Sequence, residues 1–205
     1  MVIATAGFTA ALGATTLQCR GVKPGDGELL VTDAAGGFGP IAMALLGGMC
    51  DDVVGSTSRS HEAACLKALA TASTADRNQF MLPVKPLHSG RWAGVVDTGG
   101  SDTFVKASVQ TRFNGAVAAC GLAGGSDYHG TMRPFILRGV TLCSISAILN
   151  PDSQRRKSWT LLAPHTDVVK LESMAHEIRL RQVLDRASDT LAGNVRGRLM
   201  VDVNR

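Results

Sequence analysis

The stretch Glu28–Leu46, ELLVTDAAGGFGPIAMALL, decides the fold of this 205-residue chain. Its first part, Glu28–Thr32, is a short apolar run of the kind that forms a buried strand. The glycine-rich run Asp33–Gly39 lets the chain turn tightly and expose backbone N–H groups. Pro40–Leu46 is apolar and predicts a helix, with Pro40 in the first turn, where its missing N–H leaves no bond unmade. A strand, a glycine turn and a helix in this order can bind a pyrophosphate, because free amides and the helix dipole face the anion.

The turn matches the dinucleotide-binding pattern G-x-G-x-x-G only in part. Ala34 takes the place of the first glycine, Gly36 of the second and Gly39 of the third, and Gly37 is additional. We expect Gly36 to let the backbone approach a phosphate and Gly39 to let the helix pack closely on the strand. The alternative is a tight strand–helix turn with no ligand. The segments on both sides of the turn favour nucleotide binding.

The rest of the chain alternates between strand-like and helix-like segments. Further strands are expected at residues 52–55, 92–96, 115–120, 139–149 and 198–203. Helices are expected at residues 5–18, 60–73, 102–110, 153–162 and 180–191, and residues 74–91 are expected to form a loop with at most a short strand. Glycines gather after three strands, at 33–39, 97–100 and 121–125. This predicts an α/β fold, a doubly wound parallel sheet of the Rossmann type, with its ligand outside the carboxyl ends of the strands.

The composition excludes several classes of function. The chain is long enough for one domain, or one domain and a further piece, and its apolar fraction of 45% can fill a core. A net charge of +4 is too small to indicate a nucleic-acid partner. No apolar run reaches the roughly 18 residues of a membrane span, and the apolar start lacks the basic residues of a signal peptide.

The five cysteines indicate neither a disulfide framework nor a metal site. They are Cys19, Cys50, Cys65, Cys120 and Cys143. Their number is odd and no two form a C-x-x-C pair, so we expect reduced cysteines in a cytoplasmic protein that holds no metal.

The end of the second strand favours NADP over NAD. A protein that reads NAD places Asp or Glu there to bind the ribose 2′-hydroxyl. Here Ser56, Thr57, Ser58 and Arg59 follow Gly55, and no acid is present. Hydroxyls and a guanidinium suit a 2′-phosphate. The alternative is a polar loop that caps the next helix, with Arg59 merely solvated.

Asp33 conflicts with this interpretation, because a carboxylate beside a pyrophosphate site would weaken binding by charge repulsion. If its side chain points away from the site, Asp33 instead caps the turn.

No catalytic motif is visible, so the catalytic residue stays unknown. Cys120 could face a nicotinamide but is more often a packing residue at such a position. Tyr128 could donate a proton, but a plain role in the loop ranks above that one.

Several segments together resemble the zinc-independent medium-chain dehydrogenase/reductases. The segments are Thr5–Ala10, Gly36–Gly39, Trp92–Thr98, Val117–Gly125 (VAACGLAGG) and Pro134–Arg138 (PFILR). Within that family the chain is most similar to the acryloyl-CoA reductase and quinone-oxidoreductase-like branch.

The resemblance implies NADPH as hydride donor, an α,β-unsaturated acyl-CoA as small-molecule substrate, no metal, and commonly a homodimer. By position it assigns Ala35, Gly36, Gly37, Phe38 and Gly39 to the phosphate loop. It assigns Thr57, Ser58 and Arg59 to the 2′-phosphate, and Cys120 and Leu142 to the nicotinamide half.

The chain also departs from the family pattern. The family has a GroES-like lobe before the part that matches Met1, and this sequence does not include it. We therefore expect residues 1–150 to form the NADP-binding domain, and residues 151–205 to be the segment that in the family packs on that lobe. Asp33 stands where the family has a small residue, and Ser58 where it has glycine. Three hypotheses follow: an NADPH-dependent reductase, a non-catalytic NADP-binding fragment, or a degenerate chain that binds nothing.

Overall fold

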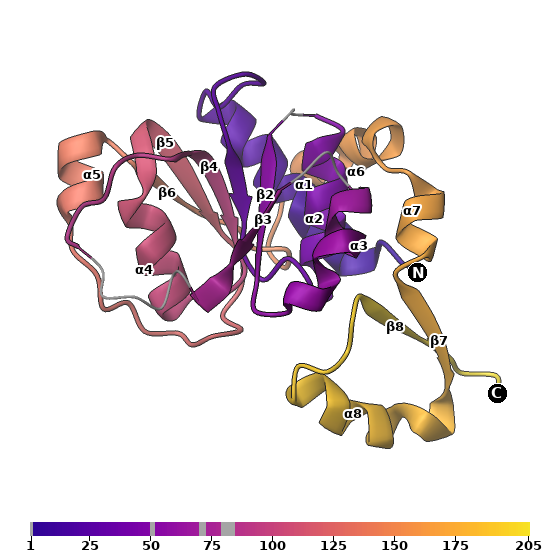
Figure 1. Ribbon diagram of the computed structural model, residues 1–205. Coiled ribbons are helices and arrows are strands. Elements are labelled where there is room, and N and C mark those ends of the chain that lie inside the picture. The colour runs from indigo at the N-terminus through magenta and orange to yellow at the C-terminus, as the bar shows by residue number, and fades with distance from the viewer. Residues whose placement is uncertain (1, 50–51, 70–72, 79–84) are drawn as a thin grey trace.

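The computed structural model describes residues 2–49, 52–69, 73–78 and 85–205. Its centre is a six-stranded sheet with helices on both faces (Figure 1). The strands are β1 Leu29–Val31, β2 Val53–Thr57, β3 Ser73–Asp76, β4 Trp92–Asp97, β5 Thr111–Ala119 and β6 Thr141–Ser144. They follow the order β3-β2-β1-β4-β5-β6, and every neighbouring pair is parallel. The predicted doubly wound parallel sheet is therefore confirmed, and the strand order reverses between β1 and β4.

The helices form two layers, and each layer covers its own hydrophobic core. One face carries α1 Ala4–Cys19, α2 Gly39–Gly47 and α3 Ala63–Leu69, and the other carries α4 Ser101–Val109 and α5 Arg133–Arg138 (Figure 1). Successive side chains of a strand point to opposite faces. Leu29 and Val31 accordingly pack in the core under α1 and α2, and Leu30 packs in the core under α4. Helix α2 has apolar residues on all its sides, as expected for a helix that is almost completely buried.

The two tryptophans mark different parts of this packing. Trp92 on β4 is fully buried in the core under α4. Trp159 lies on α6 Asp152–His165, which packs against α1. Its ring stacks on Phe8 of α1 with centroids 6.1 Å apart, and 43% of the residue is exposed.

Residues 175–205 form a separate small layer. After α7 Val168–Glu172 come β7 Ala175–Arg179, η3 Leu180–Gln182, α8 Val183–Leu191 and β8 Arg198–Asp202. β7 and β8 pair in parallel as a second, two-stranded sheet. We call residues 175–205 the C-terminal unit. It lies to one side of the main sheet, beyond α3 (Figure 1), and none of the residues of α8 is buried.

Some predicted boundaries are wrong. The expected helix over 60–73 is a short η1 Ser60–Glu62 followed by α3, and Ser73 already belongs to β3. The expected strand over 139–149 is limited to β6, because Gly139 ends α5 in a left-handed conformation. Helices α5 and α7 and strand β7 were not expected, since their short sequences carry no clear apolar periodicity. The last expected strand exists as β8, but it belongs to the second sheet.

The expectations for the cysteines and for a membrane span can be compared with the described residues. Cys50 and residues 79–84 lie outside the described part of the chain. The cysteines that the structure does describe, Cys19, Cys65, Cys120 and Cys143, are free thiols. Among the described helices, none combines the length and hydrophobicity needed to cross a membrane.

Candidate functional site

The glycine turn connects β1 to α2 at the point where the strand order reverses. A Cβ atom on Gly39 would lie 2.4 Å from the Cα of Ala34, so only glycine permits this approach of α2 to the turn. The amides of Gly37 and Phe38 donate no hydrogen bond to any described residue. The turn therefore offers the free N–H groups that an anion would need.

A polar network joins the end of β1 to the end of β4 beside this turn. The Thr32 hydroxyl donates to Asp97 Oδ1 at 2.7 Å, and the Gly100 amide donates to Asp97 Oδ2 at 2.8 Å. The amide of Thr98 donates in turn to Thr32 Oγ1. Asp97 is fully buried, and desolvation raises the pKa of its carboxyl despite these hydrogen bonds. The network fixes the two loops that flank the point of strand reversal.

Asp33 opens the turn in the left-handed region of the backbone, with φ of 51°. Asp tolerates this region better than most residues, at a cost of about 1 kcal/mol. Its Oδ1 lies 3.9 Å from Nη1 of Arg77, which directly follows β3. Arg77 was not predicted from the sequence, since nothing in the spacing of the chain indicates that β3 ends beside the turn.

The loop after β2 approaches the same turn. The buried Thr57 hydroxyl accepts a hydrogen bond from the Arg59 amide at 3.0 Å, and Ser58 is exposed. The Arg59 guanidinium donates to the carbonyl of Ala35 at 2.9 Å and to that of Val195 at 2.8 Å. Arg59 is therefore not merely solvated: it links the turn to the C-terminal unit and keeps further N–H donors available.

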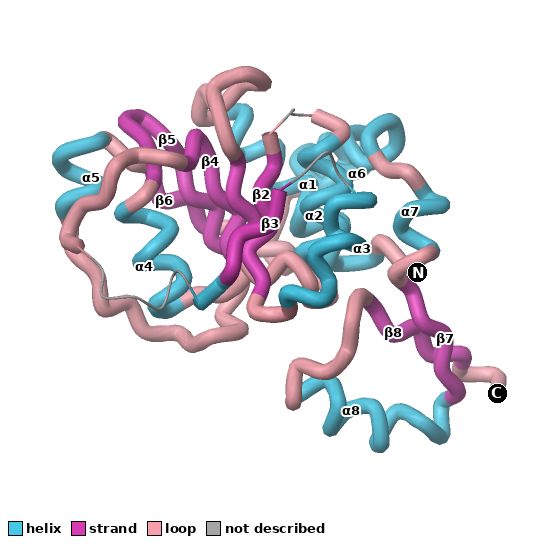
Figure 2. The backbone as a smooth tube through the Cα atoms, in the orientation of Figure 1, coloured by secondary structure: helices cyan, strands magenta, loops and turns pink. Residues whose placement is uncertain are grey.

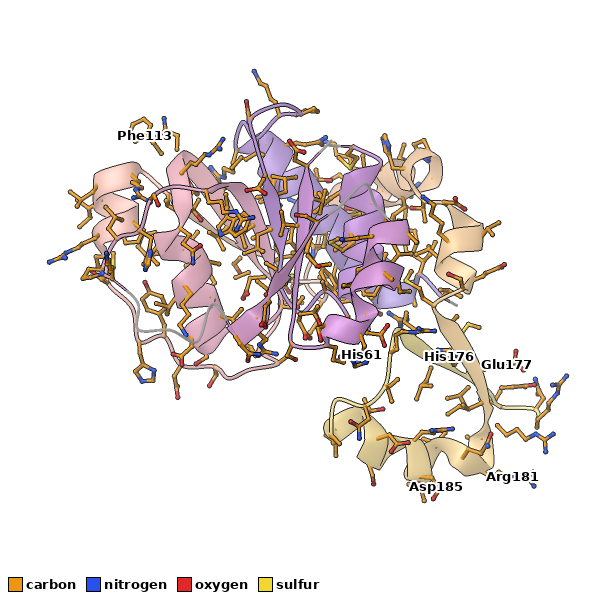
Figure 3. All side chains as sticks on the ribbon, in the orientation of Figure 1. His61, Phe113, His176, Glu177, Arg181 and Asp185 are labelled. Atoms are coloured by element: carbon orange, nitrogen blue, oxygen red, sulfur yellow. The ribbon has the colours of Figure 1, made fainter. Side chains whose placement is uncertain are left out.

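Two adjoining cavities lie between the turn and the C-terminal unit. The first, about 570 Å³, is named here the turn cavity; its lining includes Asp33, Gly36, Gly37, Arg59, Arg77 and Arg198. The second, about 520 Å³, is named the loop cavity; its lining includes Asp33, Ser58, Arg59, His61, Glu62 and Arg77. Figure 3 shows His61 on the side of the sheet that faces the C-terminal unit. The fold thus brings the glycine turn and the loop after β2 together, as their sequence positions suggested.

Arg198, at the start of β8, is a second residue of the cavity wall that was not predicted from the sequence. Its guanidinium has no hydrogen bond or ion pair with any described residue, and partial burial lowers its pKa. A partly desolvated cation without a partner among the described residues, on the wall of the turn cavity, is available to bind an anion. The only sequence signal was its basic character, which it shares with many surface residues.

Cys120 and Leu142 lie apart from the turn cavity. The Cys120 thiol donates to the carbonyl of Asp97 at 3.2 Å, and burial raises its pKa to about 12. Leu142 is 51% exposed and lines a third, apolar cavity of about 510 Å³ near Phe104 and Tyr128. Part of its lining, including Leu122 and Met132, comes from the long loop that runs from β5 past α4 to α5. Figure 2 shows the path of this loop.

Within residues 2–49, 52–69, 73–78 and 85–205, no three His, Cys, Asp or Glu side chains come together in a way that could hold a metal ion.

Fold and turn together define a Rossmann-type nucleotide-binding domain. No family model matches the sequence. Acrylyl-CoA reductase AcuI of Ruegeria pomeroyi is 38% identical over 205 residues, which cover 100% of this chain and 62% of the relative. The crystal structure of Escherichia coli YhdH with bound NADPH superposes with a TM-score of 0.95 at 38% identity, over 100% of this chain and 63% of that one. Bacillus subtilis YhfP, a putative quinone oxidoreductase solved with NAD bound, has a TM-score of 0.91 at 34% identity, over 99% of this chain and 62% of that one.

These likenesses confirm the family resemblance. The chain is a homologue of the acrylyl-CoA reductase and quinone oxidoreductase branch of the medium-chain dehydrogenase/reductases. It spans about 62% of the length of the curated relatives it matches.

Proposed function

We propose that this chain binds NADPH across the turn cavity and the loop cavity. The observation that carries the proposal is the convergence of the free turn amides with the guanidinium groups of Arg59 and Arg198. The turn fits the cofactor in that Gly36 and Gly37 add no side chains of their own, and the one side chain close to Gly36 is that of Asp33, whose Oδ2 lies 2.8 Å from where a Cβ of Gly36 would stand. The NADPH bound to the E. coli relative supports the same choice.

The proposed contacts follow the two cavities. The turn would hold the pyrophosphate through Ala35, Gly36, Gly37, Phe38 and Gly39, with Arg198 as an added cation. The loop after β2 would hold the 2′-phosphate through Thr57, Ser58 and Arg59. Cys120 and Leu142 would lie towards the nicotinamide. When bound, NADPH supplies the hydride, and the residues of this chain bind and orient it.

We further propose that the chain is the cofactor-binding part of a reductase that acts on the C=C bond of an α,β-unsaturated acyl-CoA, such as acryloyl-CoA. The R. pomeroyi relative, an acrylyl-CoA reductase, supports this substrate class. The Cys120 thiol, with a pKa of about 12, stays protonated at neutral pH and is no base there. The catalytic residue is left unassigned.

The remaining parts of the proposal concern the setting of the enzyme. We propose a cytoplasmic enzyme that works without zinc, in keeping with the free thiols of the described cysteines. A homodimer is proposed because β6 ends the sheet with an unpaired edge and exposed apolar residues surround it, among them Leu137 and Leu142. Residues 1–150 would supply most of the cofactor site, while residues 151–205 would add Arg198 to it and would pack on the substrate-binding lobe.

The first test is a titration of the purified chain with NADPH and with NADH, followed by fluorescence. The Arg59→Ala variant should lose NADPH affinity by about tenfold while NADH affinity changes less, since a phosphate–guanidinium contact is lost. Arg156→Ala, an exposed arginine on α6, is the matched control and should change neither. Equal losses for both cofactors would contradict the 2′-phosphate assignment.

The second test separates the three hypotheses. The chain is mixed with NADPH and acryloyl-CoA, and the absorbance of the reduced cofactor is followed. Oxidation of NADPH supports the reductase. Binding without oxidation indicates the non-catalytic NADP-binding fragment, and the absence of binding indicates the degenerate chain.

A further inference from the structure

The conflict posed by Asp33 has a structural counterpart in Arg77. Asp33, Arg59 and Arg77 are the charged residues that line both the turn cavity and the loop cavity. The Arg59 guanidinium is already held by two backbone carbonyls. Arg77 has one charged partner among the described residues, Asp33, at the long distance of 3.9 Å. Both side chains of this pair are about one third exposed, at 31% and 33%.

The position of this pair is directly in front of the turn. Asp33 Oδ2 lies 2.8 Å from where a Cβ of Gly36 would stand, so the carboxylate sits over the backbone proposed to meet the pyrophosphate. On the other side, Arg77 Nη2 lies 3.3 Å from where a Cβ of Gly124 would stand. The Arg77 guanidinium therefore spans the opening between the glycine turn and the glycine cluster at 121–125.

A long ion pair between side chains that are about one third exposed contributes little energy and is easily exchanged. A phosphate offers more negative charge and more acceptor oxygens to a guanidinium than one carboxylate does. We propose that Arg77 is a pyrophosphate-binding residue and that the Asp33 carboxylate competes with the pyrophosphate for its guanidinium. This inference rests on the proposed cofactor site. In the free protein Asp33 holds Arg77; in the complex Arg77 turns to the pyrophosphate, and the carboxylate is left beside the anion. Asp33 thereby lowers affinity for the cofactor without abolishing binding.

The central test is Asp33→Asn, because Asn keeps the shape of the side chain and also tolerates a positive φ. Removal of the competing charge should tighten NADPH and NADH binding alike, by about three- to tenfold at low salt, and the gain should shrink as salt is added. Arg77→Gln should weaken both cofactors by about tenfold. This equal effect distinguishes the pair from Arg59, which is expected to change the ratio of the two affinities.

The double variant tests the exchange itself. With Arg77 present, Asp33→Asn removes both the repulsion and the competition. In an Arg77→Gln background it removes the repulsion alone, so the gain from Asp33→Asn should be at least twofold smaller. An equal or larger gain without Arg77 would overturn the exchange, and unchanged affinities in Asp33→Asn would overturn the role of Asp33. Melting temperatures are measured for every variant, to show that each is folded.

The outcome also separates this inference from the proposed function. If the unaltered chain binds cofactor and Asp33→Asn binds it equally well, only the inference fails. If neither the unaltered chain nor Asp33→Asn binds either cofactor, the proposed function fails and the inference fails with it.

Discussion

The main sheet and the C-terminal unit are built on opposite principles. Helix α2, which packs on the main sheet, has eight of its nine residues buried, and all three residues of β1 are buried. Helix α8 in the C-terminal unit has no buried residue, and Leu184 and Leu191 are 83% and 91% exposed. Figure 3 shows Arg181 and Asp185 of this unit pointing away from the main sheet. One part has its own hydrophobic core; the other is a thin layer of strand pair and helix.

What joins the two parts is mostly polar. The Arg59 guanidinium reaches the carbonyl of Val195, and Arg196 Nη1 lies 3.4 Å from Oε2 of Glu62. The carbonyl of Gly197 lies 3.3 Å from where a Cβ of Gly37 would stand. These contacts lie at the two proposed cofactor cavities. Because the main sheet depends on a buried core and the C-terminal unit on polar contacts, the stability of the sheet and the placement of the unit can be perturbed separately.

The largest expected effect contrasts a leucine in each part. Leu45→Ala removes a fully buried side chain of α2 and should lower the free energy of unfolding by about 2–5 kcal/mol, since it leaves a cavity. Leu184→Ala on α8 should change it by less than about 0.5 kcal/mol. Urea unfolding followed by circular dichroism measures both. Similar losses in the two variants would show that α8 is packed as tightly as α2.

The next contrast uses two glycines of the turn. Gly39→Ala would bring its Cβ to 2.4 Å from Ala34 Cα, against backbone that cannot move aside, and should cost about 1–3 kcal/mol. Gly37→Ala meets only the Gly197 carbonyl at 3.3 Å and should cost less than about 1 kcal/mol, because that neighbour belongs to the C-terminal unit and can shift. Thermal unfolding of the two variants decides. A larger loss in Gly37→Ala would mean that the C-terminal unit is rigidly fixed to the turn.

Arg59→Ala should affect the C-terminal unit more than the sheet. It removes two hydrogen bonds from a charged donor, each worth roughly 1.5–3 kcal/mol at most where solvent is excluded and less at this half-buried position. Proteolysis within residues 190–198 should therefore become several-fold faster, while the melting temperature of the sheet changes little. Arg181→Ala, exposed on the same unit, is the control. Unchanged cleavage in Arg59→Ala would show that this link does not hold the unit.

The smallest expected effect compares an ion pair in each part. Glu28 accepts from Arg91 at 2.7 and 3.0 Å, and these hydrogen bonds lower its pKa below the ordinary 4.5. A lowered pKa in the folded state adds stability above the unfolded pKa, and this is lost as pH falls through the folded value. Glu28→Gln should thus cost about 0.5 kcal/mol at pH 7, reduced by solvent screening, and almost nothing at pH 3.

Glu177 provides the control for that comparison, because its 3.6 Å contact with Arg205 in the C-terminal unit is more exposed, at 57% and 67%. Glu177→Gln should change the free energy of unfolding by less than about 0.5 kcal/mol, since the contact is exposed to solvent. Denaturant unfolding at pH 7 and pH 3 measures both variants. A Glu28→Gln deficit that persists at pH 3 would show that the carboxylate charge is not its source.

The sequence predicted the main sheet well because its signals are local. The strand, turn and helix of Glu28–Leu46 carry a continuous apolar run, glycines and a proline, and the structure has β1, the turn and α2 at those places. β7 was missed because its residues are largely exposed, so its sequence AHEIR shows no apolar face. The helix predicted over 60–73 runs too far, because no stop signal in the sequence precedes Ser73, which belongs to β3.

The candidate site was predictable only where its residues are close in sequence. The turn and the loop after β2 were identified from their own composition. Arg77 follows β3 and Arg198 begins β8, and their approach to the turn depends on the three-dimensional path of the chain. Arg59 was expected as a contact for phosphate, whereas its bonds to the Ala35 and Val195 carbonyls depend on how the C-terminal unit is placed.

The contrasting surroundings of the two tryptophans should give the protein an intrinsic fluorescence with two distinguishable components. The indole of Trp92 is shielded from water and should emit at short wavelength, whereas the partly exposed Trp159 should emit further to the red. Because Trp159 stacks on Phe8 across α1 and α6, separation of these helices would shift the red component alone. Emission spectra can therefore follow the loosening of α6 and the melting of the sheet as two distinct signals in a single sample.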